Sequence, residues 1–337
     1  MQVIKLKSNP GTRFRFGEAL GAFPEEIHNA QKSTSQYLHS DTLWSALVNA
    51  WALCCPETIE NFISECKNGR FKLSSAFYCV EFKKKNVYFF PKPVSLNLFQ
   101  FDEPKKLKKV SFISKGVWET GLLPKDWFNS EKCVLLQNES IIALKSEIDM
   151  PMPIKLFSIE TSPKTHARDV TEREDSFYYE TDLFLTYGDD YKVDWYFLTE
   201  NNLSESLQND FKEALQTLVN FGIGGERSSG CGSLTKYEEK ILDIELAEMS
   251  NYRCSVSLIA PQKNELMENS LYQTIKRGGR FAERGKCLPM IQMLLEGAVF
   301  DTEIQGRIVT LNENPPVLRY GLNLDIPLNN NFISDEL

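Results

Sequence analysis

A segment rich in glycine limits the folds that are open to this chain. It reads Gly222-Ile223-Gly224-Gly225-Glu226-Arg227-Ser228-Ser229-Gly230-Cys231-Gly232 and follows a helical pattern. Glycine permits positive φ and lets the main chain approach a ligand closely. Such a loop can aim several N–H groups at phosphate oxygens. The segment therefore predicts a helix–strand connection that binds phosphate, unless its glycines serve only the geometry of the connection.

Two familiar nucleotide-binding sites are excluded by the spacing of these glycines. The chain has no G-x-x-x-x-G-K-[ST] motif, so the lysine of a triphosphate loop is missing. It also has no G-x-G-x-x-G turn between a strand and a helix, which dinucleotide-binding domains require. We therefore expect no nucleotide cofactor.

Length and composition indicate a soluble protein of about two domains. The chain has 337 residues, of which 42% are hydrophobic and 25% are charged. It has no apolar run long enough to cross a membrane, and its N-terminus lacks the apolar core of a secretion signal. The eight cysteines form no C-x-x-C pair. These features favour a reducing cytoplasm, with no membrane association and no metal site.

Charge is distributed unevenly along the chain, although the net charge is −8. Residues 67–125 contain 13 Lys and Arg against four acids, a balance of +9, whereas residues 168–194 contain nine acids against three bases, a balance of −6. One surface could therefore face a polyanion and another a different partner, although both could equally be solvated faces.

The order of expected elements indicates an α+β fold. Strands are expected at 3–7, 13–16, 77–82 and 87–90, and helices at 40–51, 59–66 and 204–218. Alternating runs at 178–187 and 191–198 flank Gly188-Asp189-Asp190, which is typical of a hairpin turn. We place a domain boundary near residue 240. The order strand, helix, two strands, helix, loop, strand before it suits a ferredoxin-like or RNA-recognition-motif sheet with insertions.

Three further motifs could contribute to a site. His39-Ser40-Asp41 precedes a helix, where His39 could act on a phosphate or could simply fix the loop. Thr165-His166-Ala167-Arg168 precedes the acidic region. The basic residues Lys276, Arg277 and Arg280 surround Gly278-Gly279, which suits either phosphate binding or an ordinary charged turn.

Taken together, these motifs resemble the RAMP superfamily of CRISPR proteins. More narrowly, the chain is similar to the Cas-five-like group that supplies the fourth subunit of the type III-A Csm effector complex. The resemblance rests on residues 39–47, 165–168, 222–232 and 276–279, in this order along the chain.

The resemblance implies two ferredoxin-like domains, at 1–240 and 241–337, of which the second is degenerate and strand-rich. It implies a non-catalytic subunit that caps the crRNA 5′ end by holding the repeat-derived tag. Its partners would be the large polymerase/cyclase-like subunit and a backbone RAMP subunit, with target RNA reached only through the complex and no homo-oligomer. The RNA-binding residues implied are Gly222, Gly224, Gly225, Arg227, Ser228, Ser229, Gly230, Gly232, His39, His166, Arg168, Lys276, Arg277 and Arg280.

The resemblance also implies a protruding β-hairpin, or thumb, for which the candidate is about Asp169 to Glu180. Its four acids at 169–175 do not suit a tip that grips phosphate. Arg15 stands where family members often carry a histidine, so no catalytic role is carried to that position.

Two other functions remain open on the sequence alone. One is a metal-independent endoribonuclease that processes precursor crRNA, with His39 or His166 as acid or base and Arg227 beside the phosphorane. The other is a protein scaffold with incidental RNA contacts.

Overall fold

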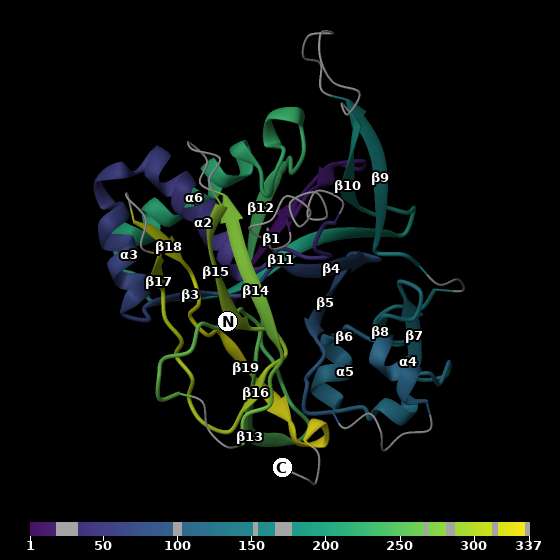
Figure 1. Ribbon diagram of the computed structural model, residues 1–337. Helices are drawn as coiled ribbons and strands as arrows, with labels where there is room; N and C mark the ends of the chain where they lie inside the picture. The colour runs from purple at the N-terminus through teal and green to yellow at the C-terminus, as the bar shows by residue number, and fades with distance from the viewer. Residues whose placement is uncertain are drawn as a thin grey trace.

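The computed structural model describes residues 1–17, 33–96, 103–150, 154–165, 177–265, 269–280, 287–311 and 316–333. It confirms an α+β protein with a large sheet and few helices (Figure 1). His166, Arg168 and most of the expected thumb, residues 166–176, lie outside the described residues.

A nine-stranded sheet forms the centre of the molecule. Its order is β12-β1-β11-β4-β5-β6-β8-β7, and β3 also pairs with β11. Its strands are β1 (Gln2–Lys7), β3 (Phe71–Leu73), β4 (Phe77–Phe82), β5 (Lys85–Pro91), β6 (Phe112–Ser114), β7 (Cys133–Leu136), β8 (Ile141–Leu144), β11 (Tyr191–Asn201) and β12 (Lys236–Ile241).

Four of these strands, β12, β1, β11 and β4, are neighbours and pair antiparallel throughout. One helix, α2 (Ser40–Cys54), lies in the chain between β1 and β4, and another, α6 (Glu205–Phe221), lies between β11 and β12. Numbered along the chain, the four strands therefore stand in the order 4-1-3-2. The glycine-rich segment is the connection from α6 to β12, as the sequence predicts.

Apolar periodicity explains both long helices. In α2 the buried side chains include Leu43, Leu47 and Trp51, and in α6 they include Phe211 and Leu218, so each helix buries one stripe. The two helices pack against each other (Figure 1). In the part of the chain that the structure describes, the other helices are α3 (Ile59–Lys67), α4 (Pro104–Lys109) and α5 (Lys115–Thr120), with short 3₁₀ turns η1 (Pro56–Thr58), η3 (Pro124–Asp126), η4 (Arg227–Ser229) and η5 (Asn330–Phe332).

The lysine-rich part of the chain belongs to a lobe at one end of the large sheet. Strands β6 to β8 and helices α4 and α5 form this lobe, at the lower right in Figure 1. In α4, Leu107 is buried while the four lysines at 105, 106, 108 and 109 are exposed.

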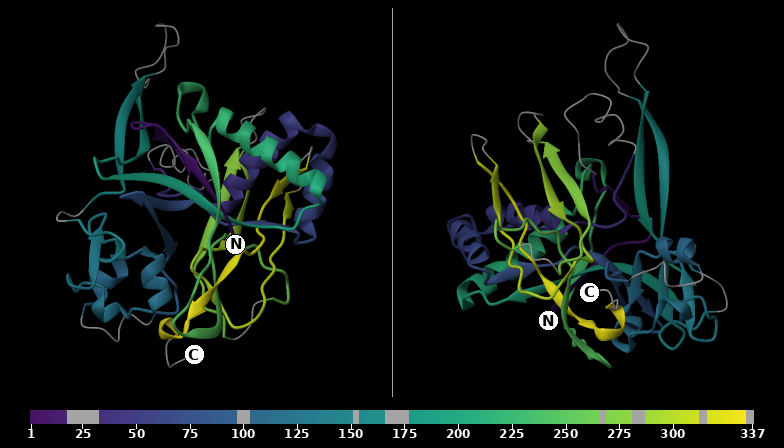
Figure 2. Two further views of the ribbon diagram at one scale, coloured as in Figure 1. Left: turned by 180° about the vertical axis from the view of Figure 1, so that it is seen from behind. Right: turned by 60° about the horizontal axis from the view of Figure 1, so that its bottom comes forward.

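The expected hairpin around Gly188 forms only at its turn, where Gly188 donates its amide to the carbonyl of Tyr191 at 2.9 Å. Strand β10 (Phe177–Leu185) pairs with β9 (Phe157–Thr165) and with β2 (Arg13–Phe14), whereas β11 enters the large sheet. Among the described residues, the two runs meet only next to this turn, through the isolated bridge between Tyr187 and Lys192 and the amide of Val193, which donates to the carbonyl of Thr186. The strands separate because β10 continues its alternation against β9 along nine residue pairs. The β9–β10 hairpin projects from the body in both views of Figure 2.

The chain after β12 contributes short strands in three smaller sheets. These are β13 (Met249–Ser255) with β16 (Val299–Phe300) and β19 (Asp325–Asn329), β14 (Thr274–Arg280) with β15 (Cys287–Leu294), and β17 (Val309–Leu311) with β18 (Val317–Arg319). Residues from both sides of position 240 share the largest hydrophobic cluster. The boundary near 240 stays a prediction.

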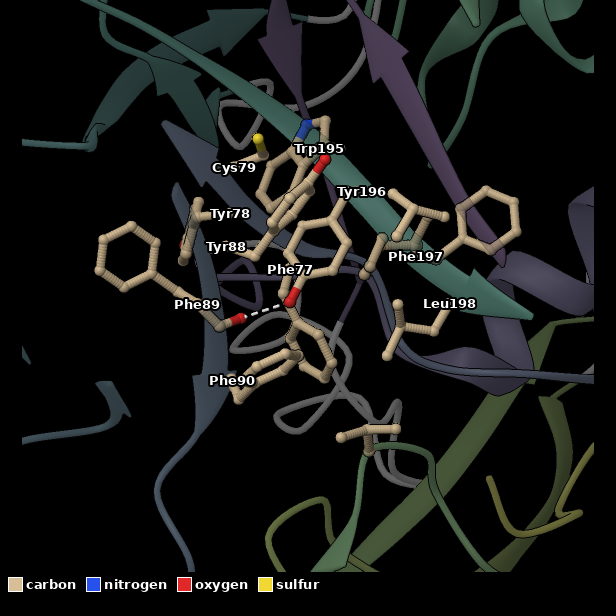
Figure 3. Close-up of a cluster of buried hydrophobic side chains, with 14 of the residues drawn as sticks. Phe77, Tyr78, Cys79, Tyr88, Phe89, Phe90, Trp195, Tyr196, Phe197 and Leu198 are labelled. Atoms are coloured by element: carbon tan, nitrogen blue, oxygen red, sulfur yellow. Dashed lines mark hydrogen bonds between the residues drawn. The ribbon is translucent and has the colours of Figure 1, made fainter. Parts of the chain in front are cut away.

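Aromatic side chains fill the core beneath β4, β5 and β11 (Figure 3). Tyr78 stacks on Phe157 with ring centroids 5.3 Å apart, and the hydroxyl of Tyr196 donates to the carbonyl of Phe89 at 2.7 Å. Because buried tyrosine hydroxyls need a partner, this bond fixes β11 against β5.

Candidate nucleic-acid interface

The glycine-rich loop is at the surface. Helix α6 ends at Phe221, and Gly222 follows as its C-cap with φ of 77°. Residues 225–230 are exposed, while the two ends of the loop, at Gly222 and Gly232, are buried. The exposed tip is thus held on a buried base.

Three of the glycines are required by the geometry of this base. A Cβ on Gly232 would lie 1.8 Å from the carbonyl oxygen of Ile223, and one on Gly222 would lie 2.6 Å from the carbonyl oxygen of Gly232. A Cβ on Gly224 would lie 2.5 Å from the carbonyl oxygen of Arg15. All three have φ between 73° and 85°. The interpretation that the glycines serve geometry alone therefore holds for the base of the loop.

The tip of the loop presents unused donors. Gly225, Gly230 and Gly232 donate their amides to main-chain carbonyls. Within the described residues, four other amides have no acceptor, those of Glu226, Arg227 and Ser228 at the tip and that of Gly224 beside it. A Cβ on Gly225 would meet nothing closer than 3.8 Å, and one on Gly230 nothing within 4 Å. Amides left without an acceptor on a turn, beside the exposed Arg227, are donors that an anion such as phosphate can use.

A short extended segment joins this loop to the β9–β10 hairpin. The carbonyls of Arg13 and Arg15 accept the amides of Gly232 at 2.6 Å and Gly225 at 2.9 Å. The same segment contains β2, which pairs with β10 through Phe14 and Leu183. The loop and the base of the hairpin are therefore parts of one surface.

His39 lies in a buried cluster rather than at this surface. It is 5% exposed, and its Nδ1 lies 2.9 Å from Oε1 of Glu296, which is 4% exposed. The hydroxyls of Ser75 and Tyr37 also donate to Glu296. Burial would raise the pKa of Glu296, but His39 and the Ser75 hydroxyl outweigh it and lower that pKa below its ordinary value. His39 makes no side-chain cap bond to α2. Its contacts with Ser35 and Glu296 instead fix the loop before the helix, which is one of the two roles that the sequence left open.

Arg277 is a correction to the expected site. Its Nε and Nη2 donate to the two carboxylate oxygens of Asp41 at 3.0 and 2.9 Å, and it is 4% exposed. Arg319 donates to the same carboxylate at 2.8 Å. Arg277 cannot contact a phosphate from inside the protein, because the strand places it on the face opposite Lys276. Asp41 likewise does not cap α2 but joins that helix to β14.

The other basic residues of this motif are placed differently. Lys276 is exposed on β14, whereas only the backbone of Arg280 is described, in the same strand. The motif is a strand and not a charged turn.

Sequence reasoning missed Arg13 as a contact of the glycine-rich loop and gave Arg15 no role. The alternating run Arg13-Phe14-Arg15-Phe16 was the available signal, because it buries Phe14 and Phe16 and turns both arginines to the other side. Glu296 carried no sequence signal.

The described cysteines behave as small apolar side chains. All seven are free, and burial raises the pKa of Cys66, Cys79 and Cys133 to about 12. No group of three or more metal-type ligands gathers within the described ranges. None of the described helices has the length and apolarity to span a membrane.

Comparisons with known proteins agree with the motifs. Residues 248–328 match the family model of the CRISPR Csm4 C-terminal domain. A relative from Methanocaldococcus jannaschii, described as "CRISPR system Cms protein Csm4", is 26% identical over 352 residues, covering 91% of this chain and 88% of the relative.

Solved structures share the fold along almost the whole chain. A chain of the Csm3-Csm4 subcomplex of the type III-A CRISPR-Cas interference complex has a TM-score of 0.66 at 22% identity, with 98% of this chain and 100% of that chain covered. A chain of the Csm1-Csm4 cassette in complex with pppApA has a TM-score of 0.57 at 15% identity, with 99% and 98% covered. The resemblance stated from the motifs is confirmed.

Proposed function

We propose that this chain, which is similar to Csm4 of type III-A complexes along nearly its full length, is a non-catalytic, crRNA-binding subunit of such a complex. It caps the crRNA 5′ end by holding the repeat-derived tag. It does so in the cytoplasm, as one copy between the large polymerase/cyclase-like subunit and a backbone RAMP subunit. Target RNA is reached through the complex.

One observation carries this proposal, namely the donor site at the tip of the glycine-rich loop. The four amides without acceptors lie beside the exposed Arg227 and on a rigid base. Main-chain amides and a guanidinium recognise phosphate oxygens without reading base identity. This arrangement suits the backbone of a single RNA strand.

The β9–β10 hairpin adds an aromatic side chain to the RNA surface proposed at the glycine-rich loop. Tyr179 of β10 is 50% exposed, and an exposed ring can stack on an unpaired base. Because β2 connects the hairpin to the loop, a ring and a phosphate site are available on adjoining elements.

The strand order supports the interpretation that the N-terminal part is a ferredoxin-like domain. The strand order 4-1-3-2, with a helix after the first and third strands, is that of a β-α-β-β-α-β unit. The smaller sheets after β12 suit a degenerate second unit.

The geometry around His39 favours binding over cleavage by this residue, while the other candidate base, His166, lies outside the described residues. A general base must reach the 2′-hydroxyl whose proton it takes. Both nitrogens of the His39 ring face protein groups, Glu296 and Ser35, in the interior. His39 is therefore poorly placed to take that proton.

The test uses the complex assembled with its co-expressed partner subunits. We expect Arg227→Ala and Gly225→Glu to lower retention of the guide and to expose its 5′ end to exonuclease. The log–log salt slope of RNA binding should fall by about 0.7 for each phosphate contact that is lost. Arg70→Ala, which removes a side chain that is 61% exposed and paired with Glu65, is the control. Assembly with normal guide retention in both loop variants would contradict the proposal.

A second assay tests the non-catalytic assignment. The purified chain is incubated with repeat RNA in EDTA, and no specific cut is expected. A specific cut that is lost in His39→Ala would replace the binding function with the endoribonuclease.

A further inference from the structure

The segment Arg13–Phe16 touches both parts of the proposed RNA surface. On one side its carbonyls accept the amides of Gly225 and Gly232. On the other side Arg13 pairs with Phe184 in the ladder between β2 and β10. We call residues 13–16 the strut.

Side chains of the strut repeat this double contact. Nη2 of Arg13 donates to the carbonyl of Ser229 in the loop at 2.8 Å, and its Nη1 lies 3.6 Å from Oδ2 of Asp182 in β10. Nη1 of Arg15 lies 2.8 Å from Oε1 of Glu180 in β10. A planar guanidinium can satisfy two partners in fixed directions, which a lysine ammonium at the end of a flexible chain does less well.

The two ion pairs differ in quality. The Arg15–Glu180 pair is within hydrogen-bond distance, whereas the 3.6 Å between Arg13 and Asp182 is not. Asp182 is 3% exposed, and its Oδ1 has no hydrogen-bond partner among the described residues. A buried carboxylate oxygen without a donor is costly. Arg13 therefore attracts Asp182 through charge without a hydrogen bond, and its contact with Oδ2 does not satisfy Oδ1.

We propose that Arg13 is a positioning residue that couples the glycine-rich loop to the β9–β10 hairpin, so that RNA held at one strengthens RNA binding at the other. The proposal rests on the proposed function for its RNA part. Its structural part, the coupling of two elements through one guanidinium, stands on the contacts alone. The alternative role for Arg13, which the second experiment below distinguishes, is a direct contact with a phosphate.

The first experiment measures amide hydrogen exchange on the full chain without RNA. Arg13→Ala, Arg13→Lys and Asp182→Asn should each speed exchange about tenfold in β2, β10 and residues 229–232, because a charge-assisted contact is lost. Arg70→Ala is the control and should leave these segments unchanged. Exchange that accelerates equally in the distant strands β13 and β19 would mean general destabilisation and would overturn the coupling. Unchanged exchange would also overturn it.

The second experiment measures coupling in RNA binding by the assembled complex. Arg227→Ala and Tyr179→Ala are combined in a double-mutant cycle, first with Arg13 intact and then in an Arg13→Lys background. We expect a coupling factor of at least about threefold with Arg13 and none with lysine. A direct phosphate role predicts that lysine preserves both affinity and coupling, and that result would refute the positioning role.

The two experiments separate the proposals. If the wild-type complex binds RNA without any contribution from Arg227 and Tyr179, the proposed function fails while the exchange result still decides the coupling. If the RNA contributions are present but independent of each other, the coupling fails and the proposed function stands.

Discussion

Removing the carboxylate of Asp41 should be among the most damaging single changes in the protein. The side chain of Asp41 is 1% exposed, and those of Arg277 and Arg319 are 5% and 10% exposed. The Asp41→Ala variant would leave two buried guanidinium groups without the carboxylate that both of them contact. Breaking a buried pair in this way costs about 3–5 kcal/mol of unfolding free energy. Since domains have only about 5–15 kcal/mol in total, the variant should be close to unfolding.

The assay is urea unfolding followed by circular dichroism, with Arg70→Ala as the control. The exposed pair of Arg70 with Glu65 should contribute less than about 1 kcal/mol. A loss in Asp41→Ala no larger than that of the control would refute the reasoning.

A triple variant distinguishes charge from packing. Asp41→Leu, Arg277→Met and Arg319→Met together replace the charged groups by apolar side chains of similar size. Such replacements are often neutral or stabilising, so the triple variant should regain most of the stability that Asp41→Ala loses. If it remains as unstable as Asp41→Ala, the charges are not the cause.

The same carboxylate gives a pH dependence. Burial would raise the pKa of Asp41, but Arg277 and Arg319 outweigh it and hold that pKa well below its ordinary range. A carboxyl with a depressed folded-state pKa stabilises the protein above its unfolded pKa, about 4, and this contribution is lost as the pH falls. The difference in unfolding free energy between the wild type and Asp41→Ala should therefore be constant from pH 6 to 8 and shrink below about pH 4. A difference that grows in acid would contradict this.

Two further predictions concern stability. Gly232→Ala should destabilise the protein more than Gly230→Ala, because a Cβ at 232 would lie 1.8 Å from the carbonyl oxygen of Ile223. A Cβ at 230 would meet nothing within 4 Å, so that variant loses only about 1–2 kcal/mol of stability, through left-handed backbone strain. Urea unfolding that shows the reverse order would disprove this prediction. Burial lowers the pKa of Lys92 to about 8, so the folded state resists its charge, and wild-type stability should rise relative to Lys92→Met between pH 8 and 10.5. Parallel stability curves for these two proteins across that range would show the reasoning to be wrong.

Periodic elements were predictable from the sequence, and their partners were not. The apolar stripe and the glycine stop fixed α6 almost to the residue, because both signals are local. The runs on either side of Gly188 were correctly expected to be strands, but strand pairing depends on surfaces that are distant in the chain.

The candidate site divides in the same way. The exposed tip of the glycine-rich loop follows from its composition, whereas its attachment to Arg13 and Arg15 comes from a segment some 200 residues away. For Arg277 the available signal was strand alternation, which places it opposite Lys276, but its buried partner Asp41 lies 236 residues away. Contacts at that separation are set by packing and not by any local pattern.

The five tryptophans of the chain are all sealed from solvent, none more than 2% exposed. One of them, Trp195, lies edge-on against Phe14 and Phe16, at 5.7 and 5.3 Å between ring centroids. The fluorescence of Trp195 therefore depends on its contacts with Phe14 and Phe16, whereas the other four tryptophans report on other parts of the core. The protein carries its own optical probe for a shift of that segment, and following it requires no label.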